Sequence, residues 1–428
     1  MVKNLIKQLN KSEFLKNALM LITGTVIAQF IPILLQPILR RMFTPEDFGT
    51  FAVYTSLLGI VVSIANLRYE STVMLPQKDS DAANLVVAGG VISFLMAALS
   101  GVVLLIFGEA IISFFDLDPQ LLWLFYFLPI SIFFFSAYQS MNYYLIRKKA
   151  FRMSSLNKVI RRGGEGSTQI GVGSYFSSIG LIIGTIAGDV LNFSSGIFQL
   201  RRKGFKRKWV KYVKILALLK RYKDFPLYNA VPALLNTLSL TLPVLIITKF
   251  YGEEVTGYFD LSRMVLALPL ALVSVSVSQV VFQTISEKIR NRQSIIEVIK
   301  KTTVGLGAVA VIMVVVGIFF SVPVFTFVFG EQWELSGSMT QILIASYALK
   351  FVVSPLSITF NALEKIRLSS SWQLLYFLSI LLLLFFKDEP IETFLNYYLI
   401  IDLIAYTIYY LLMIVQVTSY EKSLNETR

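Results

Sequence analysis

Long apolar tracts recur along the whole chain, each close to the length needed to cross a lipid bilayer. A membrane-spanning helix needs about 20 consecutive apolar residues, whereas a transmembrane β-strand needs only about 10. The tracts are therefore too long for barrel strands and predict α-helices, which satisfy every backbone polar group within hydrocarbon. The predicted spans are 18–39, 48–67, 83–107, 121–146, 178–200, 227–249, 258–282, 304–328, 339–361, 370–386 and 394–417.

One polar stretch lies between two of these spans. Residues 157–176 read NKVIRRGGEGSTQIGVGSYF, with two adjacent arginines, a glutamate and several glycines. Basic clusters precede it at 147–152 and follow it at 201–223. Cytoplasmic loops carry the excess of Lys and Arg, so both clusters should lie on the same side of the membrane. An even number of crossings is then required. We predict that this stretch is itself a span, with a loop or a re-entrant segment as the alternative.

The distribution of charge also predicts the orientation. With twelve spans, most of the 39 Lys and Arg residues fall on cytoplasmic segments, and both termini are cytoplasmic. Met1 to Lys16 has apolar residues at helical spacing among lysines and predicts an amphipathic helix on the membrane surface. The loops on the opposite side are short and mostly acidic, with Glu109, Asp116, Asp118, Glu253, Glu254, Glu331, Glu334, Asp388 and Glu389.

Composition agrees with a membrane protein and narrows its chemistry. The 428 residues are 55% hydrophobic and only 15% charged, whereas soluble chains are nearer a quarter charged. The chain has no Cys and no His, which excludes disulfides, thiolate chemistry, histidine metal sites and Ser-His triads. We therefore expect neither a metal nor a bound cofactor. The net charge of +13 comes from residues between spans, which indicates topology rather than binding to nucleic acid.

Two similar patterns suggest that the chain has two halves. LLQPILRRMFTPEDFGTFAVY and TLPVLIITKFYGEEVTGYFDLS each place a proline in an apolar span, followed by a short acidic turn and a Gly-x-Phe. Six spans per half give both halves the same orientation, which predicts a parallel repeat with a substrate path between the halves. The predicted domains are a six-helix bundle at 1–200, a basic cytoplasmic linker at 201–225 and a second six-helix bundle at 226–428.

Three segments resemble a known family of transporters. They are FTPEDFGTFAVYTSLLGIVVSIANLRYESTVMLP, GLIIGTIAGDVL and YKDFPLYNAVPALLNTLSLTLPVLIITKFYGEEVTGYFDLSRMVLALPLALVSVSVSQVVFQ. Together they are similar to polysaccharide-unit flippases of the O-antigen (Wzx) type, in the multidrug/oligosaccharidyl-lipid/polysaccharide exporter (MOP) superfamily. The resemblance is specific from about residue 17 to about 290 and weaker to about 417. Glycines at 163, 164 and 166 depart from the family's more apolar fifth span.

The resemblance implies an all-α integral membrane fold of 12 helices in two bundles around a central cavity. It also implies alternating-access transport of an undecaprenyl-pyrophosphate-linked oligosaccharide across the bacterial inner membrane. The transported unit would supply O-antigen, capsule or exopolysaccharide synthesis. A polysaccharide polymerase and other assembly proteins would be its partners.

Charges inside spans are costly and therefore candidate functional residues. Guanidinium groups suit a diphosphate because their fork bonds two oxygens at once. Arg263 is the first candidate for substrate binding, because it lies where the family resemblance is strongest. Arg161 or Arg162 is the second, and Lys350 is the third. Arg161 and Arg162 are adjacent, so they lie about 100° apart on a helix and at most one should face a cavity squarely.

The same charges have a structural alternative. Arg161 and Glu165 lie at i, i+4, and Asp260 and Arg263 lie at i, i+3, so each pair could neutralise itself on its own helix. Carboxylates inside spans are also candidates for coupling transport to a proton or cation gradient. These candidates are Asp189, Glu165, Asp402 and Asp260.

Charges near the span ends are candidate gates. Arg68 and Glu70 follow the second span, and Arg40 and Arg41 lie at the outer end of the first. They could meet across the halves in one conformation, or they could be ordinary interface anchors.

Three other functions predict different sequence features from those of a flippase. A drug or cation antiporter of the same superfamily predicts a cavity dominated by carboxylates. A membrane glycosyltransferase or polysaccharide polymerase predicts a large external loop with catalytic residues, which this chain lacks. A scaffold would leave the charges inside spans without a use. We therefore expect a transporter without catalytic residues.

Overall fold

The computed structural model describes residues 13–173 and 177–426, and every regular element in these ranges is helical. The predicted surface helix at residues 1–16 lies largely outside the described ranges. The chain divides into two compact units, Met1–Thr237 (unit 1) and Leu238–Arg428 (unit 2). This boundary falls inside one long helix, beyond the predicted start of the second bundle at 226. The predicted linker at 201–225 belongs to unit 1.

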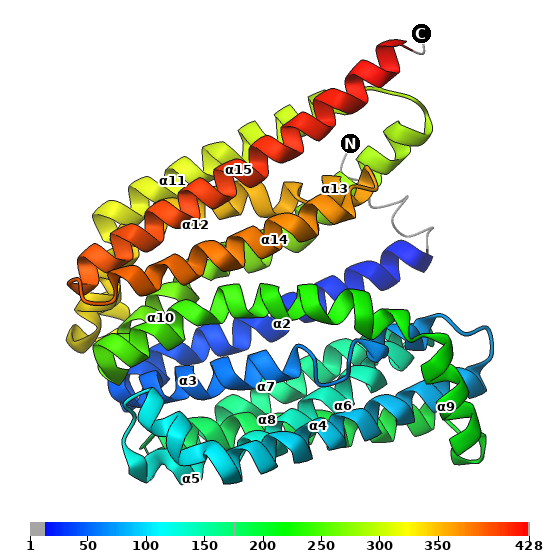
Figure 1. The fold of residues 1–428 in the computed structure, drawn as a ribbon, viewed down its shortest axis with the longest axis horizontal. Coiled ribbons are helices and arrows are strands. Elements are labelled where there is room, and N and C mark those ends of the chain that lie inside the picture. Colours follow the sequence, from blue (N-terminus) through cyan, green and yellow to red (C-terminus); the bar gives the residue numbers. More distant parts are fainter. Residues whose placement is uncertain (1–12, 174–176, 427–428) are drawn as a thin grey trace. The chain divides into compact units, whose positions relative to one another are not determined.

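Unit 1 is built from helices that follow the predicted spans. Helix α7 packs between α2 and α8, while α6 packs against both α4 and α8 (Figure 1). The short helix α9 of the basic linker packs against α4. The helices are α2 (Glu13–Met42), α3 (Pro45–Val62), α4 (Asp79–Phe114), α5 (Leu122–Phe125), α6 (Leu128–Arg147), α7 (Phe151–Gly173), α8 (Ser177–Arg202) and α9 (Tyr212–Arg221).

The polar stretch at 157–176 is helical up to Gly173, so the alternative of a loop is wrong for its described part. Helix α7 has 23 residues and is therefore about 34 Å long, enough to cross the hydrocarbon core. Its sequence is too polar for it to belong to the eight described helical stretches that are long and apolar enough to span a membrane. The total of twelve crossings stays a prediction.

Glycines make the contact between α7 and α8 possible. A Cβ on Gly188 of α8 would lie 2.7 Å from the backbone oxygen of Arg161, and one on Gly184 would lie 2.9 Å from that of Glu165. Real Cβ atoms do not approach a backbone oxygen this closely, so only glycine permits the observed spacing. Gly184 and Gly188, one turn apart on α8, therefore form a packing surface for α7, as is common for small residues between membrane helices.

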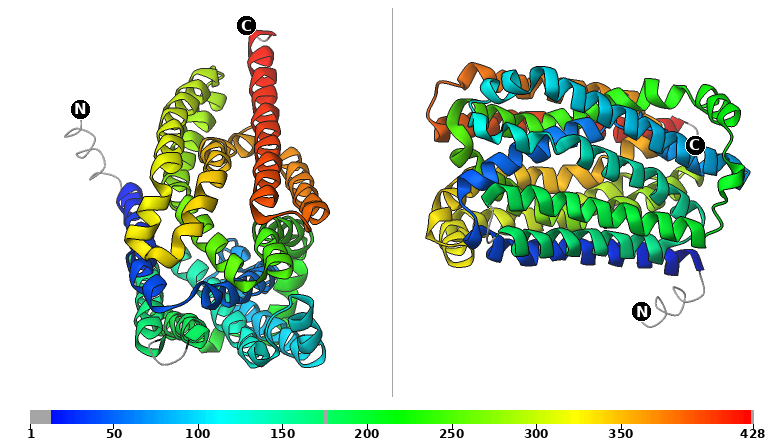
Figure 2. Two further views of the ribbon diagram at one scale, coloured as in Figure 1. Left: turned by 90° about the vertical axis from the view of Figure 1, so that its left-hand side faces the viewer. Right: turned by 90° about the horizontal axis from the view of Figure 1, so that it is seen from below.

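Unit 2 is a second set of helices. Helix α12 packs against α11 and α15, and α15 also packs against α14 (Figure 2). The two predicted spans at 227–249 and 258–282 are two helical segments that share the label α10 and meet at a kink at Gly252, whose backbone angles are non-helical, φ 88° and ψ 174°. The helices are α10 (Val231–Arg290), α11 (Ile296–Phe329), α12 (Glu334–Leu356), α13 (Thr359–Ala362), α14 (Ile366–Leu381) and α15 (Ile391–Glu426).

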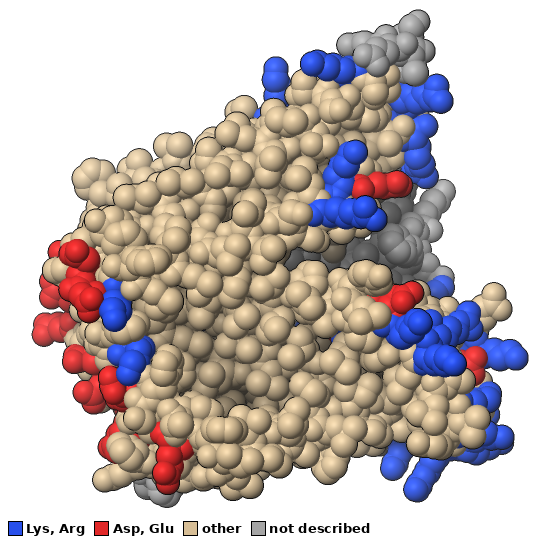
Figure 3. All heavy atoms as spheres, viewed as in Figure 1, with Lys and Arg blue, Asp and Glu red and all other residues tan. Residues whose placement is uncertain are grey.

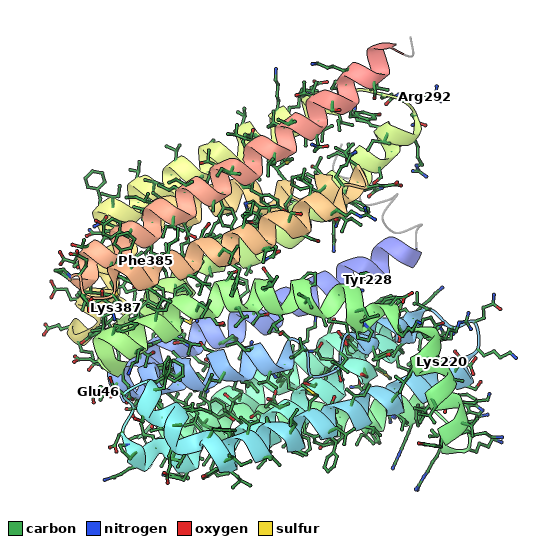
Figure 4. The ribbon with its side chains drawn as sticks, viewed as in Figure 1. Glu46, Lys220, Tyr228, Arg292, Phe385 and Lys387 are labelled. Carbon is green, nitrogen blue, oxygen red and sulfur yellow. The ribbon has the colours of Figure 1, made fainter. Side chains whose placement is uncertain are left out.

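Each unit separates its charges toward the two ends of its helices. In unit 1, Lys and Arg gather at the end that holds α9, and Asp and Glu gather mostly at the other (Figure 3). Glu46 and Lys220 mark these two ends of unit 1, and Lys387 and Arg292 mark the two ends of unit 2 (Figure 4). Between the ends the surface is apolar, with many exposed Leu, Ile, Val and Phe side chains on α4 and α11. This is the pattern of a multi-pass membrane protein.

Candidate functional site: charged residues inside the two units

Arg161 and Asp189 join α7 to α8 in unit 1. Arg161 Nε donates a hydrogen bond of 2.6 Å to Asp189 Oδ1, and the guanidinium also lies 4.7 Å from the centre of the Phe135 ring. The Asp189 side chain is 0% exposed and that of Arg161 is 17% exposed. Within the described part of the chain, Asp189 Oδ2 has no hydrogen-bond partner. The pair is thus buried on the Asp189 side and open on the Arg161 side.

The structural alternative, in which Arg161 and Glu165 pair at i, i+4 on their own helix, is wrong for this pair. Glu165 instead pairs with Arg162, whose Nη1 lies 2.8 Å from Glu165 Oε2, and it also accepts from Thr185 Oγ1 at 3.5 Å. Arg161 is directed to α8 because the glycines of α8 bring Asp189 within reach. Arg161 therefore pairs with the fully buried Asp189 of the neighbouring helix α8 rather than with the less buried Glu165 of its own helix.

Both arginines line a polar cavity of about 380 Å³ inside unit 1, with Lys158 beside them. We expected only one of the two to face a cavity, but both side chains are long enough to reach it from adjacent positions on α7. Among the described residues, the lining contains three cations, several amides and two tyrosines but no carboxylate. We call this space the polar cavity. Its lining residues are Ala28, Gln29, Phe135, Tyr138, Gln139, Asn142, Tyr143, Lys158, Arg161, Arg162 and Asn192.

Several lining residues were not singled out from the sequence. Neither Lys158 nor the amides of Gln139, Asn142 and Asn192 were considered as binding residues. The spacing of the amides could have identified them. Gln139 and Asn142 lie at i, i+3 on α6, and Asn192 follows Asp189 by three residues on α8, so each pair lies on one face of its helix. A polar stripe of this kind on an otherwise apolar helix indicates a face turned to protein or water.

Amide side chains join α7 to α8 about one helical turn before Arg161 in the sequence of α7. Asn157 Nδ2 donates to Gln199 Oε1 at 2.9 Å, and Gln199 Nε2 donates back to Asn157 Oδ1 at 2.7 Å. Ser195 Oγ adds a third hydrogen bond to Asn157 Oδ1 at 2.8 Å. Buried polar groups that are satisfied in this way fix the orientation of their helices. They therefore fix the position of the Arg161 side chain on the wall of the polar cavity.

Unit 2 contains a different ion pair, between Lys350 of α12 and Asp402 of α15. The two side chains are in direct contact and are 5% and 0% exposed. Tyr376 of α14 donates a hydrogen bond of 2.8 Å to Asp402 Oδ1. The Lys350 ammonium also lies 4.8 Å from the Tyr347 ring centre and 5.3 Å from that of Tyr406. The sequence named both charged residues as candidates but did not predict that they pair.

The predicted i, i+3 pair of Asp260 and Arg263 is present on α10. Arg263 Nη2 lies 3.2 Å from Asp260 Oδ1, and Nη1 donates to the Leu240 carbonyl at 3.1 Å. Their side chains are 17% and 25% exposed, so the pair is partly open. Arg263 therefore stays a candidate for substrate binding, but two of its donors already have partners.

The predicted gate residues of unit 1 make local contacts. Arg40 is buried, donates from Nε to Gln36 Oε1 at 3.1 Å and lies 3.5 Å from the Phe48 ring centre, while Arg41 is exposed. Arg68 has a left-handed backbone with φ 62°, and its Nη1 lies 3.4 Å from Glu70 Oε1. These contacts are those of structural anchors, and gating stays a prediction.

Glu70 lies in the short helix η1 (Tyr69–Met74), outside the predicted spans. Burial raises the pKa of its carboxyl above the ordinary value, because the charged form loses hydration. A hydrogen bond from its own backbone N–H and the Arg68 charge oppose this effect only in part. Glu70 Oε2 has no hydrogen-bond partner among the described residues.

In the described ranges, no group of three or more Asp and Glu residues could hold a metal ion. The charges inside the units are instead arranged as pairs on facing or adjacent turns.

The fold is similar to that of known transporters. An inward-facing multidrug-resistance MATE transporter of the MOP superfamily superimposes with a TM-score of 0.74 at 14% identity, over 92% of this chain and 96% of that one. The lipid II flippase MurJ, in an inward closed conformation, has a TM-score of 0.71 at 16% identity, over 93% and 90% of the two chains. These likenesses confirm the fold of the MOP superfamily.

Sequence comparison identifies the family. The teichuronic acid biosynthesis protein TuaB of Bacillus subtilis (strain 168) is 23% identical over 181 residues, which are 41% of this chain and only 38% of that protein. Residues 38–337 match the family described as "Polysaccharide biosynthesis protein", which is more than half of the chain. The chain therefore belongs to the polysaccharide biosynthesis protein family, and its fold is that of solved transporters of the MOP superfamily.

Proposed function

We propose that this protein is a flippase that moves an undecaprenyl-pyrophosphate-linked oligosaccharide from the cytoplasmic to the outer leaflet of the bacterial inner membrane. The transported units would be assembled into a surface polysaccharide such as O-antigen, capsule or exopolysaccharide. Membership in the polysaccharide biosynthesis family and a fold like that of a lipid II flippase support this assignment. The two halves would open alternately to the two sides, with both termini in the cytoplasm.

The main structural support for the proposal is the polar cavity of unit 1. Lys158, Arg161 and Arg162 bring three positive charges to one wall, which suits a diphosphate. Asp189 engages only Nε of Arg161, and a guanidinium has five N–H donors, so donors remain for an anionic ligand. Amides such as Gln139 and Asn142, together with Tyr138, match the hydroxyl groups of a sugar.

The cavity lining also distinguishes the flippase from the antiporter. An antiporter that binds cations needs carboxylates at its binding site, whereas the described lining of the polar cavity contains none. Two carboxylates inside the predicted spans, Asp189 and Glu165, pair with Arg161 and Arg162 but are not among the described lining residues. We assign to Asp189 the coupling of transport to a proton or cation gradient, because it is buried and keeps one oxygen without a partner.

The test is a flipping assay with purified protein in proteoliposomes that contain a fluorescent undecaprenyl-diphosphate-linked oligosaccharide. The wild type should move the lipid between leaflets. Lys158→Met should lower the rate about tenfold, since a hydrogen bond to a charged group contributes about 1.5 kcal/mol, and Lys158→Arg should retain most of it. Lys301→Met is the control, because Lys301 is 77% exposed and pairs with Glu297. A wild type that moves no lipid-linked oligosaccharide would overturn the proposal, and exchange of a soluble cation would favour the antiporter.

A further inference from the structure

Unit 1 contains a second cavity, which is larger than the polar cavity and has a far more apolar lining. It has a volume of about 600 Å³, lies between α4, α6 and α8, and is lined almost wholly by apolar side chains. Phe94, Phe133, Met141 and Phe193 form much of its wall, and Arg201 and Arg207 lie at the end of α8 and just beyond it. We call it the α4–α6–α8 groove. Its volume lies within the range of ligand-binding sites in proteins.

Aromatic rings shape the walls of this groove. The Phe133 ring lies 5.6 Å from that of Phe193 and 6.0 Å from that of Phe94, which places one ring from each helix around the same space. Phe94 is exposed, and so are Val91 and Leu95 of the same helix. The groove is therefore continuous with the apolar surface of α4, which in a membrane faces lipid.

Gly90 shows that the space along α4 is open. It lines the groove, and a Cβ built on it would meet no atom within 4 Å. By contrast, a Cβ on Gly89, the preceding residue, would lie 2.1 Å from Ser140 Oγ. The absence of a side chain at Gly90 is thus not needed for helix packing in the described part of unit 1, and it leaves room for a ligand.

The two arginines at the mouth of the groove are not neutralised by the carboxylates of unit 1 that pair with other basic residues near this end. Arg147 and Lys148 pair with Asp79, and Lys214 pairs with Asp81. Arg201 and Arg207 are exposed and form no ion pair with any residue that the structure describes. Unpaired guanidinium groups at the end of an apolar groove are suited to a phosphate that carries a hydrocarbon chain.

We infer that the α4–α6–α8 groove binds one anionic phospholipid of the cytoplasmic leaflet. An acyl chain lies between Phe94, Phe133 and Phe193, and the phosphate lies at Arg201 and Arg207. The charge at only one end of the groove orients the lipid with its headgroup at the basic end of unit 1. A bound lipid would connect α4 and α6 to the segment after α8. This inference is independent of the proposed flippase activity, because it concerns a different cavity and is tested by binding.

The experiment measures binding of fluorescent phosphatidylglycerol to the purified full-length protein, and native mass spectrometry counts the lipids that the protein retains. Wild type should retain one phosphatidylglycerol in preference to phosphatidylcholine. The double variant Arg201→Gln/Arg207→Gln should weaken binding about 30-fold, because each basic residue near a membrane surface contributes about 1 kcal/mol. Both side chains are exposed, so this variant should fold.

A second variant tests the apolar part of the site. Gly90→Leu should fill the groove and weaken phosphatidylglycerol binding about tenfold, without a packing conflict on α4. Gly307→Leu on α11 is the matched control, because a Cβ there also meets nothing within 4 Å, and it should bind lipid as wild type does.

Three results would overturn the inference. The first is wild-type binding by either the double arginine variant or Gly90→Leu. The second is equal retention of phosphatidylcholine, or equal competition by inorganic phosphate, because neither combines a net negative charge with an acyl chain. The third is displacement of phosphatidylglycerol by lower concentrations of undecaprenyl phosphate, which would assign the groove to the polyprenyl chain instead.

Discussion

The ion pairs Arg161–Asp189 in unit 1 and Lys350–Asp402 in unit 2 have the same charges but different surroundings. Arg161 lies on the wall of the polar cavity, and only its aspartate partner is fully buried. Lys350 and Asp402 are both buried, and tyrosines of three helices surround them. A charge with an open side can exchange its partner for a ligand, whereas an enclosed pair must be kept intact. The contrast suggests binding in unit 1 and a mainly structural pair in unit 2.

The largest effect is expected from breaking the enclosed pair. Asp402→Asn leaves the Lys350 ammonium buried without its counter-charge, which should destabilise the protein by about 3–5 kcal/mol. The double variant Lys350→Met/Asp402→Leu should recover most of this loss, because replacing a buried ion pair by apolar residues is often neutral. Thermal unfolding of the detergent-solubilised proteins measures both. A stable Asp402→Asn variant that no longer transports would instead assign Asp402 to coupling.

The next largest effect concerns the open pair and should appear in transport rather than in stability. Arg161→Gln/Asp189→Asn removes both charges, so no buried charge is left unpaired and the protein should fold. Without an imposed ion gradient, so that the coupling assigned to Asp189 does not contribute, flipping should fall by roughly 10- to 100-fold. This corresponds to losing charge-assisted hydrogen bonds of about 1.5–3 kcal/mol between Arg161 and the substrate. The double variant of unit 2 is the control and should keep most of its flipping rate. Equal losses in the two double variants would contradict the contrast between the pairs.

A smaller effect should follow from disturbing the helix contact that holds Arg161. Gly188→Ala places a Cβ 2.7 Å from the Arg161 backbone oxygen and should destabilise the protein by about 1–3 kcal/mol while shifting the arginine. Gly163→Ala on α7 is the matched control, because its Cβ would meet nothing within 4 Å, and it should be neutral or stabilising. Thermal unfolding and flipping rates together measure the effect. If both alanine variants behave alike, the α7–α8 contact is looser than the structure indicates.

The smallest effect concerns Glu70, a third buried carboxylate but one outside the predicted spans. Because its pKa is raised in the folded protein, the folded state binds more protons at Glu70 than the unfolded state does. Its contribution to stability is therefore present below the ordinary pKa of 4.5 and is lost as the pH rises through the raised value. Glu70→Gln should remove this part of the pH dependence. The measurement is the difference in melting temperature between wild type and variant across acidic to neutral pH, and a constant difference would contradict it.

Helix positions were predictable because hydrocarbon imposes a length on each apolar segment. A helix was predicted even at 157–176, although this stretch is polar, because the basic clusters before and after it must lie on the same side of the membrane. The stretch is helical up to Gly173. The two segments of α10 on either side of Gly252 were predicted from their apolar tracts and the acidic turn between them, whereas the positive φ of Gly252 was not.

The site was predictable in part. Charged residues inside spans are rare enough to be recognised individually, so Arg161, Asp189, Lys350 and Asp402 were all named beforehand. Their partners were not, because partners on different helices depend on packing. Lys158 and the amides of the polar cavity were missed because each is unremarkable until the fold brings α6, α7 and α8 together.

The sequence by itself determined that the protein lies in a lipid bilayer and where its helices are. It also determined which charged residues lie inside the membrane and must either pair with an opposite charge or serve a function. These properties follow from local composition, because each segment meets the bilayer independently. Only the tertiary structure decided that Arg161 pairs with Asp189 rather than with Glu165, and that Lys350 is enclosed whereas Arg161 is open. Which charges meet depends on how closely two helices approach. In α7 and α8 that approach is set by glycines, whose effect is visible only when the facing backbone is in place.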